Sequence, residues 1–338
     1  MKTILAKNHQ LSRANESSPE IKNQTKLIGQ SEAMKRIHST IDMVADSPTP
    51  VLISGESGTG KEVVAHLIHE RSPRQDRPFL AINCAALPKD IFENELFGHD
   101  QGAYTGANGR KEGYLEMANG GTLFFDEMAE MHPDIQAKLL RVLETKSFRR
   151  LGGKEEVKVD IRTLAATNKD VQLALKTGDL RLDLYYRFSV IEIHLPPLRE
   201  RKEDIPLLID GFLESLCVTH KKDPMTVSTE ALEAILRYDW PGNVRELHNV
   251  IERAVIISSF PEIDPQVLPE RIIGKVRTTP KSITIPMGTS LQEVEKIVIQ
   301  QTLASVGNNK TKAAKVLGLS RKSLHNKLGI YNNPLVDD

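Results

Sequence analysis

The sequence predicts an α/β domain with a mostly parallel sheet, then a small helical subdomain, then a separate all-α unit at the C-terminus. Three observations predict this order. Short apolar runs rich in β-forming residues alternate with segments of helical spacing up to about residue 198. Strand patterns then stop while helical spacing continues. A stretch with Pro280 and Pro286 separates this region from a last group of helical segments.

The composition indicates a globular protein with more than one domain. The chain has 338 residues, 39% of them hydrophobic and 27% charged, which is enough apolar material for more than one core. Its two cysteines, Cys84 and Cys217, exclude a disulfide scaffold and favour a reducing compartment. No apolar run has the length of a membrane span, and the N-terminus lacks a signal-peptide pattern. We therefore expect a cytoplasmic protein with no membrane partner.

Five apolar runs are the predicted strands, and the segments between them are long enough for helices, which is typical of parallel strands buried on both faces. The runs are 51–54, 79–82, 122–125, 161–165 and 190–193. Segments 203–218, 228–237 and 243–258 then have helical apolar spacing. These three segments predict a small all-helical lid.

The pattern divides the chain into five parts. Residues 1–25 are polar and lack aromatics, which predicts a flexible N-terminal segment. We expect an α/β subdomain at 26–198, a helical lid at 199–273, a linker at 274–288 and a helical domain at 289–330. Because 25 residues cannot fold as a regulatory domain, three sources of control stay open: a separate regulatory protein in trans, assembly of the chain on its own, or a shortened form.

A glycine-rich loop follows the first predicted strand and precedes a helix-like segment. It consists of Gly55, Glu56, Ser57, Gly58, Thr59, Gly60, Lys61 and Glu62. Between a strand and a helix this pattern predicts a P-loop, whose backbone N–H groups surround phosphate oxygens. Lys61 is then expected to reach the β- and γ-phosphates of ATP. Glu62 occupies the usual position of a magnesium-binding Ser or Thr, so either Glu62 holds Mg²⁺, directly or through water, or another acid does.

An acidic pair ends the third predicted strand, about 65 residues after the glycine-rich loop. Asp126 is expected to bind Mg²⁺, and Glu127 to orient and deprotonate the attacking water. Catalysis of phosphoryl transfer is mostly positioning and charge stabilisation, so the loop and the acidic pair together suffice for ATP hydrolysis.

Longer motifs resemble those of a known family. Residues 94–107 end in the sequence Gly102, Ala103, Tyr104, Thr105, Gly106 and Ala107. This stretch resembles the surface loop of the AAA+ activators of sigma-54 RNA polymerase, in which Phe stands at the tyrosine position. The resemblance covers about residues 26–330 and includes 55–62, 120–127, 165–168, 195–201 and 240–247. It implies an AAA+ fold, ATP and Mg²⁺ as cofactors, and a loop that contacts the sigma-54 RNA polymerase holoenzyme.

The resemblance also assigns roles around the nucleotide. It implies that Asn83 restrains the catalytic glutamate, that Asn168 senses the γ-phosphate, and that Arg245 of the lid senses the nucleotide. Arg181 and Arg187 match the arginines that reach the ATP of a neighbouring subunit. Activity would then depend on a homo-oligomer, from dimer to hexamer.

The C-terminal region is basic. Residues 271–330 contain eleven Lys or Arg against two acids, a charge pattern expected of a surface that binds phosphates. The region resembles a Fis-type helix-turn-helix, with a first helix at 311–317 and a recognition helix at 320–327. Its candidate DNA-binding residues are Ser320, which is also the expected N-cap, Arg321, Lys322, Ser323, His325, Asn326 and Lys327. An amphipathic helix from Leu291 is expected to help pair subunits.

Together these motifs predict an ATP-hydrolysing transcription activator that binds double-stranded enhancer DNA and remodels the closed sigma-54 RNA polymerase complex into the open complex. Two alternatives belong to other classes. One is a DNA-binding regulator that keeps the fold and binds ATP only as a structural ligand. The other is an AAA+ remodeller of a different substrate, against which the loop motif argues.

Overall fold

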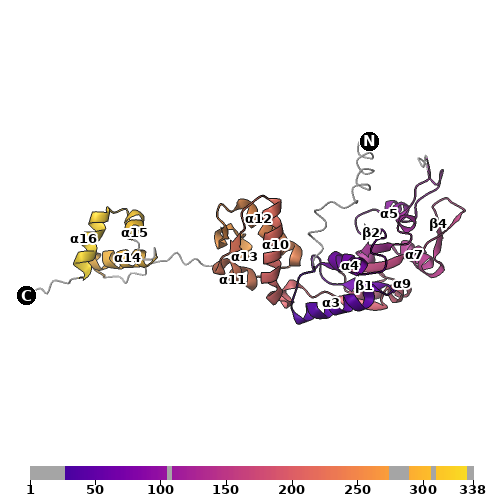
Figure 1. The fold of residues 1–338 in the computed structure, drawn as a ribbon, viewed down its shortest axis with the longest axis horizontal. Helices are drawn as coiled ribbons and strands as arrows, with labels where there is room; N and C mark the ends of the chain where they lie inside the picture. The colour runs from indigo at the N-terminus through magenta and orange to yellow at the C-terminus, as the bar shows by residue number, and fades with distance from the viewer. Residues whose placement is uncertain (1–26, 105–108, 274–288, 306–309, 333–338) are drawn as a thin grey trace, which may run out of the picture. The chain divides into compact units, whose positions relative to one another are not determined.

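The computed structural model describes residues 27–104, 109–273, 289–305 and 310–332. It divides into two units, Met1–Ile273 and Gly274–Asp338, whose elements are labelled in Figure 1. The expected N-terminal segment 1–25 and the expected linker 274–288 lie outside the described residues.

The first unit is built on a five-stranded parallel sheet. The strands are β1 (Val51–Ser54), β2 (Phe79–Asn83), β3 (Thr122–Asp126), β6 (Arg162–Thr167) and β7 (Ile191–His194), in the order β2-β3-β6-β1-β7. The register sets Ser54 opposite Thr167 and Asn83 opposite Asp126, so the carboxyl ends of the strands meet at one edge. The predicted parallel α/β class is confirmed, and ligands bind at this edge in such sheets.

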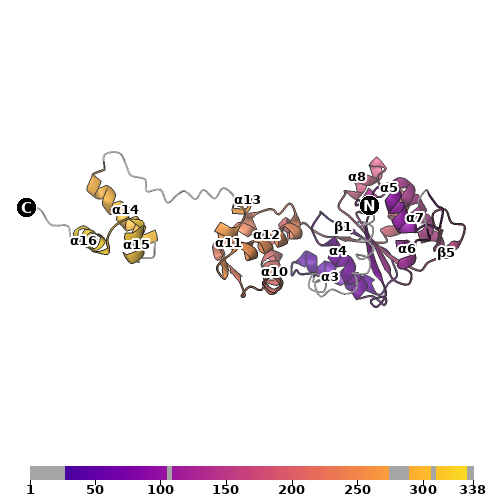
Figure 2. The same ribbon diagram turned by 90° about the horizontal axis from the view of Figure 1, so that it is seen from above.

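Helices cover both faces of the sheet. Successive side chains of a strand point to opposite sides, and in β1 and β3 the side chains on both sides are apolar and buried. Ile53 and Phe124 pack in a core with α3 (Glu32–Ala45) and α4 (Lys61–Glu70). Leu52 and Phe125 pack on the other face. The helices there include α5 (Lys89–Phe97), α6 (Tyr114–Met117), α7 (Pro133–Thr145), α8 (Val171–Thr177) and α9 (Leu182–Phe188). Figure 2 shows α3 and α4 apart from α5 and α7, which gives three layers.

Short elements complete this subdomain. The turn after β3 forms a 3₁₀ helix, η1 (Met128–Glu130). Beyond α7, β4 (Ser147–Arg149) and β5 (Glu156–Lys158) form an antiparallel hairpin. The sequence does not predict this hairpin, because strands of three residues carry too little periodicity to be recognised.

The lid packs around the single tryptophan of the chain. Trp240 is fully buried, and its indole N–H donates to the Ile235 carbonyl at 2.9 Å. The lid helices are α10 (Ile205–Thr219), α11 (Thr229–Arg237), α12 (Asn243–Ile257) and α13 (Glu270–Ile273), with 3₁₀ turns η2 (Leu198–Glu200), η3 (Lys202–Asp204) and η4 (Pro265–Val267). The prediction of an all-helical lid is wrong in one respect. Two-residue strands β8 (Thr226–Val227) and β9 (Glu262–Ile263) pair in parallel, and pairs this short leave no sequence pattern.

The described residues of the second unit form three helices, α14 (Leu291–Ser305), α15 (Lys310–Val316) and α16 (Arg321–Asn332). Its core contains Ile299, Leu303, Ala313, Ala314 and Leu324. Gly318 in the turn between α15 and α16 has a φ of 68°, a conformation that favours glycine. The Ser320 hydroxyl accepts from the Ser323 N–H at 3.0 Å and caps α16. The helix extends beyond the expected end at 327.

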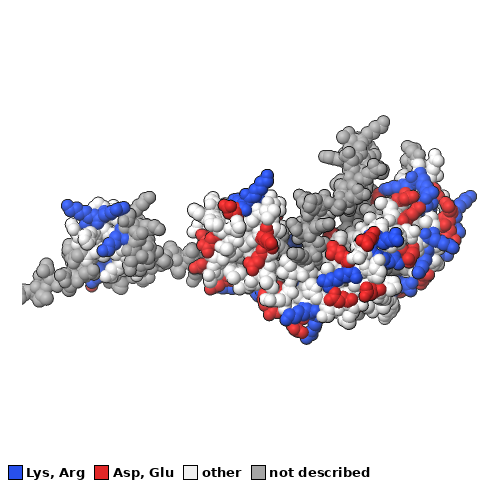
Figure 3. All heavy atoms as spheres, viewed as in Figure 1, with Lys and Arg blue, Asp and Glu red and all other residues white. Residues whose placement is uncertain are grey.

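Charges of both signs are interspersed on the face of the α/β subdomain seen in Figure 3, whereas Lys and Arg are prominent on the visible face of the second unit. This contrast agrees with the basic C-terminal sequence. Within the described ranges, no helix is both long enough and apolar enough to cross a bilayer.

Candidate nucleotide site and nucleic-acid interface

A cavity of about 500 Å³ lies at the carboxyl edge of the sheet, between the glycine-rich loop and the lid. Its polar lining includes Ser57, Gly58, Gly60, Lys61, Glu62, Asp126, Glu127 and Arg245. Its apolar lining includes Ile28, Val63, Phe212, Val218 and Val244. The fold thus brings residues of the glycine-rich loop, the acidic pair and the lid to one cavity.

The glycine-rich loop has a backbone that only glycine adopts freely at its turns. Gly58 and Gly60 have φ values of 78° and 106°. A Cβ atom added at Gly58 would lie 2.4 Å from the Gly242 carbonyl oxygen, so the lid touches the loop directly. The Lys61 ammonium donates to the carbonyls of Gly55 at 3.0 Å and Glu56 at 3.3 Å. The loop and the N-terminus of α4 together provide the N–H groups and positive potential that suit phosphate.

Glu127 leaves β3 in the left-handed conformation, with a φ of 54°. For a residue other than glycine this backbone costs about 1–3 kcal/mol, and such strain clusters at functional sites. One Glu127 carboxylate oxygen accepts from the Asn168 backbone N–H at 2.9 Å, and the other lies 3.6 Å from the Lys61 ammonium. The turn therefore aims this carboxylate at the loop lysine. The Asn168 side chain is exposed.

Asn83 makes a different contact from the one expected. Its side-chain N–H donates to an Asp126 carboxylate oxygen at 3.0 Å, and not to Glu127. The register of β2 and β3 is the reason, because it sets Asn83 directly opposite Asp126. In this structure Asn83 orients the aspartate, while the Asn168 backbone holds the glutamate.

Glu62 and Asp126 are the acids that fit a divalent cation. Burial raises the pKa of Glu62, the Asp126 charge raises it further, and Arg245 lowers it. A cation between these two carboxylates would offset the repulsion that Asp126 exerts on the charged form of Glu62. Mg²⁺ typically takes one or two carboxylates together with phosphate oxygens, so these two side chains fit the expected metal.

Arg245 approaches the glycine-rich loop from the lid. Its backbone N–H donates to the Gly58 carbonyl at 3.2 Å, and its guanidinium donates to the Ser57 hydroxyl at 3.1 Å. It also lines the cavity. Arg245 therefore connects the lid with the glycine-rich loop.

The side chain of Glu56 contacts the lid and does not line the cavity, so the expected role of Glu56 in nucleotide binding stays a prediction for its backbone. Arg199 donates two hydrogen bonds to its carboxylate at 2.7 and 2.9 Å, and Asn243 donates a third at 3.1 Å. These contacts lower the pKa of Glu56 to about 2. Sequence reasoning missed Arg199 and Asn243, although both belong to motifs that carry the family resemblance, 195–201 and 240–247.

Arg181 is the N-cap of α9 and Arg187 lies in its last turn, and neither residue lines the cavity. Arg181 pairs with Asp183 at 2.7 Å, and the Arg187 guanidinium donates to the Leu143 carbonyl at 2.7 Å. Both side chains are exposed. This position leaves them accessible to a second subunit.

The surface loop begins and ends at a short antiparallel bridge. His99 and Lys111 exchange backbone hydrogen bonds of 2.8 and 3.0 Å. Tyr104 is 49% exposed, and its ring contacts the His99 ring edge-on with centroids 5.2 Å apart. Of the predicted loop motif, Gly102, Ala103 and Tyr104 are described, whereas Thr105, Gly106 and Ala107 lie outside the described residues.

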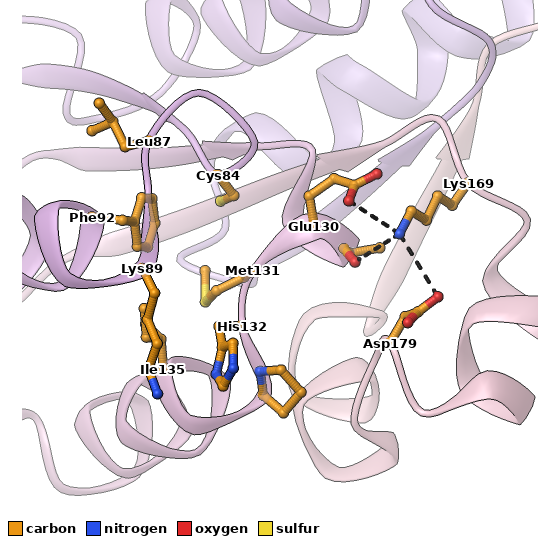
Figure 4. Close-up of a pocket in the computed structure, with 12 residues that line it drawn as sticks. Cys84, Leu87, Lys89, Phe92, Glu130, Met131, His132, Ile135, Lys169 and Asp179 are labelled. Atoms are coloured by element: carbon orange, nitrogen blue, oxygen red, sulfur yellow. Dashed lines mark hydrogen bonds and ion pairs between the residues drawn. The ribbon is translucent and has the colours of Figure 1, made fainter.

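A second cavity, of about 300 Å³, lies beside the turn after Glu127 (Figure 4). In Figure 4 the Lys169 ammonium points toward Glu130 and Asp179, at 3.2 and 3.8 Å. Cys84 lines the same cavity, and burial together with the nearby acidic pair raises the pKa of its thiol. The thiol is therefore unreactive at neutral pH. Lys169 connects the segment after Asn168 to the turn that follows Glu127.

The second unit presents its candidate DNA contacts mainly on α16. Arg321, Lys322, His325 and Asn326 are exposed, as is the N-cap Ser320. Buried Leu324 anchors the helix to the core. The hydroxyl groups of Ser320 and Ser323 lie 2.8 Å apart within the cap. The Lys327 ammonium lies 2.6 Å from a Glu295 carboxylate oxygen of α14, so it is engaged inside the unit.

Three regions of the sequence match known protein families. Residues 27–194 match the sigma-54 interaction domain, and residues 199–284 match the AAA+ ATPase lid domain. Residues 290–331 match the Fis family of bacterial regulatory proteins. The three matches follow the order of sheet, lid and C-terminal helices.

Similar proteins extend over most of the chain. Regulatory protein AtoC of Escherichia coli K12 is 45% identical over 310 residues, which are 90% of this chain and 67% of that protein. Transcriptional regulatory protein ZraR of Salmonella typhimurium is 45% identical over 302 residues, or 89% and 68%. Among solved structures, NtrX of Brucella abortus in complex with ADP has a TM-score of 0.70 at 32% identity, covering 97% of this chain and 75% of that one. The NtrX complex with ATP has a TM-score of 0.69.

Proposed function

The chain belongs to the sigma-54-dependent transcriptional activators, an AAA+ ATPase family with a DNA-binding helix-turn-helix, and from this premise we propose that it binds enhancer DNA and couples ATP hydrolysis to opening of the promoter complex. The observation that carries the proposal is the cavity in which Lys61, Glu127 and Arg245 converge. We also propose a cytoplasmic location, because both proposed partners, DNA and RNA polymerase, lie there.

The geometry supports hydrolysis by positioning. Lys61 and the loop N–H groups would hold the phosphates. Glu127, held by the Asn168 N–H at 2.9 Å, would take the proton of the attacking water. Asp126, oriented by Asn83, would hold Mg²⁺ with Glu62, directly or through water. When bound, the ion neutralises charge on the transferred phosphoryl group.

We infer that the active form is an oligomer, from dimer to hexamer. Arg181 and Arg187 are exposed and stand outside their own cavity, which supports a role at the nucleotide of a neighbour. An arginine that reaches a transferred phosphoryl group contributes about 10³–10⁵ in rate. The rate of ATP hydrolysis per subunit should therefore rise with protein concentration as subunits assemble.

The loop around Tyr104 is the proposed contact with sigma-54 RNA polymerase. The bridge between His99 and Lys111 closes the base of this loop, so the loop leaves and rejoins the domain at neighbouring backbone positions. The half-exposed ring of Tyr104 offers apolar area with a polar tip, a combination enriched at protein interfaces. A substitution in this loop could therefore remove the partner contact without changing ATP hydrolysis.

An assay that separates hydrolysis from activation tests this proposal. Phosphate release and open-complex formation at a sigma-54 promoter are measured for the wild type and for Thr105→Ala. We expect hydrolysis to stay within about twofold and open-complex formation to fall to background, because only the partner contact is removed. Thr177→Ala, on exposed α8, is the matched control and should retain both activities. Unchanged open-complex formation by Thr105→Ala would contradict the role of the loop.

A further inference from the structure

Three side chains fasten the nucleotide loop to the lid, and we call Glu56, Arg199 and Asn243 the lid clamp. The Arg199 guanidinium grips both carboxylate oxygens of Glu56, at 2.7 and 2.9 Å. Such a two-point pair fixes orientation as well as distance. The Asn243 side-chain N–H donates to the same carboxylate at 3.1 Å and to the Ser57 carbonyl at 3.0 Å. The clamp therefore joins the loop to η2 at the start of the lid and to the first residue of α12.

Asn243 is the buried member of the clamp. It is fully buried and has a φ of 52°, a left-handed conformation that Asn tolerates better than most residues. Its side-chain oxygen accepts from the Leu198 N–H at 2.8 Å. Both ends of its amide are thus satisfied, one by the entry to the lid and the other by the nucleotide loop.

The clamp controls where α12 meets the cavity. Arg245 follows Asn243 by two residues, and its backbone N–H donates to the Gly58 carbonyl at 3.2 Å. Val244 and Arg245 both line the cavity. A shift of α12 away from the loop would therefore move the lid wall of the nucleotide site as one piece.

The charged pair of the clamp is exposed, which bears on its role. The Arg199 and Glu56 side chains are 40% and 42% exposed. Pairs with this much solvent contribute little to folding stability. We therefore look for the effect of this pair in the position of the lid and not in folding stability.

We propose that the lid clamp is a positioning device: it sets the orientation of α12 and Arg245 against the glycine-rich loop and thereby sets the affinity for adenine nucleotide. The three residues are positioning residues, since they act on the nucleotide through the loop and Arg245. The inference rests on the nucleotide site alone and is independent of the proposed opening of promoter complexes.

A double-mutant cycle on the full chain tests the clamp. ADP dissociation constants are measured by calorimetry, and KM and kcat for ATP by phosphate release, for Glu56→Gln, Arg199→Gln and the double variant. We expect each single change to raise the ADP dissociation constant and KM about tenfold, with kcat changed less than about twofold. The double variant should bind ADP no more weakly than the weaker-binding single variant, because both substitutions remove the same interaction between Glu56 and Arg199.

A third variant tests the buried arm. Asn243→Gly removes the amide while keeping the left-handed turn accessible, since glycine adopts positive φ freely. It should also raise KM. Arg237→Gln is the matched control, because Arg237 pairs with Glu233 at 2.7 Å on an exposed face within the lid. Its ADP affinity should equal that of the wild type.

Thermal unfolding without nucleotide separates positioning from folding. The midpoints of Glu56→Gln and Arg199→Gln should lie within about 2 °C of the wild type, as expected for an exposed pair. A lowered midpoint with unchanged ADP affinity and KM would overturn the proposal, and so would additive effects in the double variant. Failure of the wild type to open promoter complexes would contradict the proposed function only. The role of the clamp would still be tested by the ADP dissociation constants of its variants.

Discussion

The nucleotide edge of the first unit and the recognition helix of the second assemble their functional side chains in opposite ways. Lys61, Glu127 and Arg245 come from segments far apart in the sequence, and they meet only when the sheet and lid are folded. Arg321 and Lys322 are neighbours on one capped helix. The nucleotide site therefore depends on tertiary contacts between distant segments. The recognition helix depends only on which of its own side chains are exposed.

The largest effect should come from the two arginines that we propose to reach the nucleotide site of a neighbouring subunit. We expect Arg187→Ala and Arg181→Ala to lower turnover by about 10³–10⁵ if they reach a neighbour's γ-phosphate. Steady-state phosphate release at saturating ATP measures this. Turnover that is independent of protein concentration would contradict a site completed between subunits.

A mixing experiment sharpens the same point. Arg187→Ala and Glu127→Gln subunits are each expected to be inactive alone. Mixed in equal amounts, they should regain part of the activity, because some interfaces then pair an intact glutamate with an intact arginine. No recovery in mixed oligomers of confirmed composition would mean that Arg187 acts within its own chain.

The next largest effect should come from the acidic pair. Asp126→Ala and Glu127→Gln should lower turnover by about 10²–10⁴, since they remove the proposed metal ligand and general base. DNA affinity, measured by fluorescence anisotropy, should stay unchanged because the DNA contacts belong to the other unit. Glu230→Gln, an exposed acid in the first turn of α11, is the control and should retain ATPase activity. Full ATPase activity in both variants would refute the site assignment.

These contrasts explain how much of the nucleotide site is predictable from sequence. Glycines, lysine and an acidic pair form contiguous motifs, so the sequence predicts that they belong together. Partner choice depends on register and packing. Asn83 contacts Asp126 because the two residues oppose each other across β2 and β3. Glu56 contacts Arg199, which lies 143 positions away, and no local pattern indicates that pairing.

The fold follows the same division. The five central strands are predictable because strands buried on both faces are continuous apolar runs. The β4–β5 hairpin and the β8–β9 pair are not, since two or three residues show no period. The C-terminal helices are predictable because spacing and the Ser320 cap are local signals.

The recognition helix should show smaller and graded effects. Arg321→Ala and Lys322→Ala should each weaken DNA binding about tenfold, and removing one charge that binds a phosphate should reduce the salt dependence by about one unit of slope. Lys327→Ala should cost less, because Glu295 engages its ammonium at 2.6 Å. Binding isotherms at several salt concentrations measure both quantities, with ATPase activity as the control. An equally large effect of Lys327→Ala would show that the ion pair opens on DNA.

The smallest effect is a pH dependence that should be absent. Hydrogen bonds from Arg199 and Asn243 lower the pKa of Glu56 from 4.5 to about 2. A carboxylate with a lowered pKa contributes fully above its ordinary pKa and loses that contribution only as the pH falls through the lowered value. The ratio of ADP dissociation constants between Glu56→Gln and the wild type should therefore be constant from about pH 5.5 to about pH 8.5. If the ratio instead approached one toward pH 5.5, Glu56 would be taking up a proton there, and Arg199 would not be holding it.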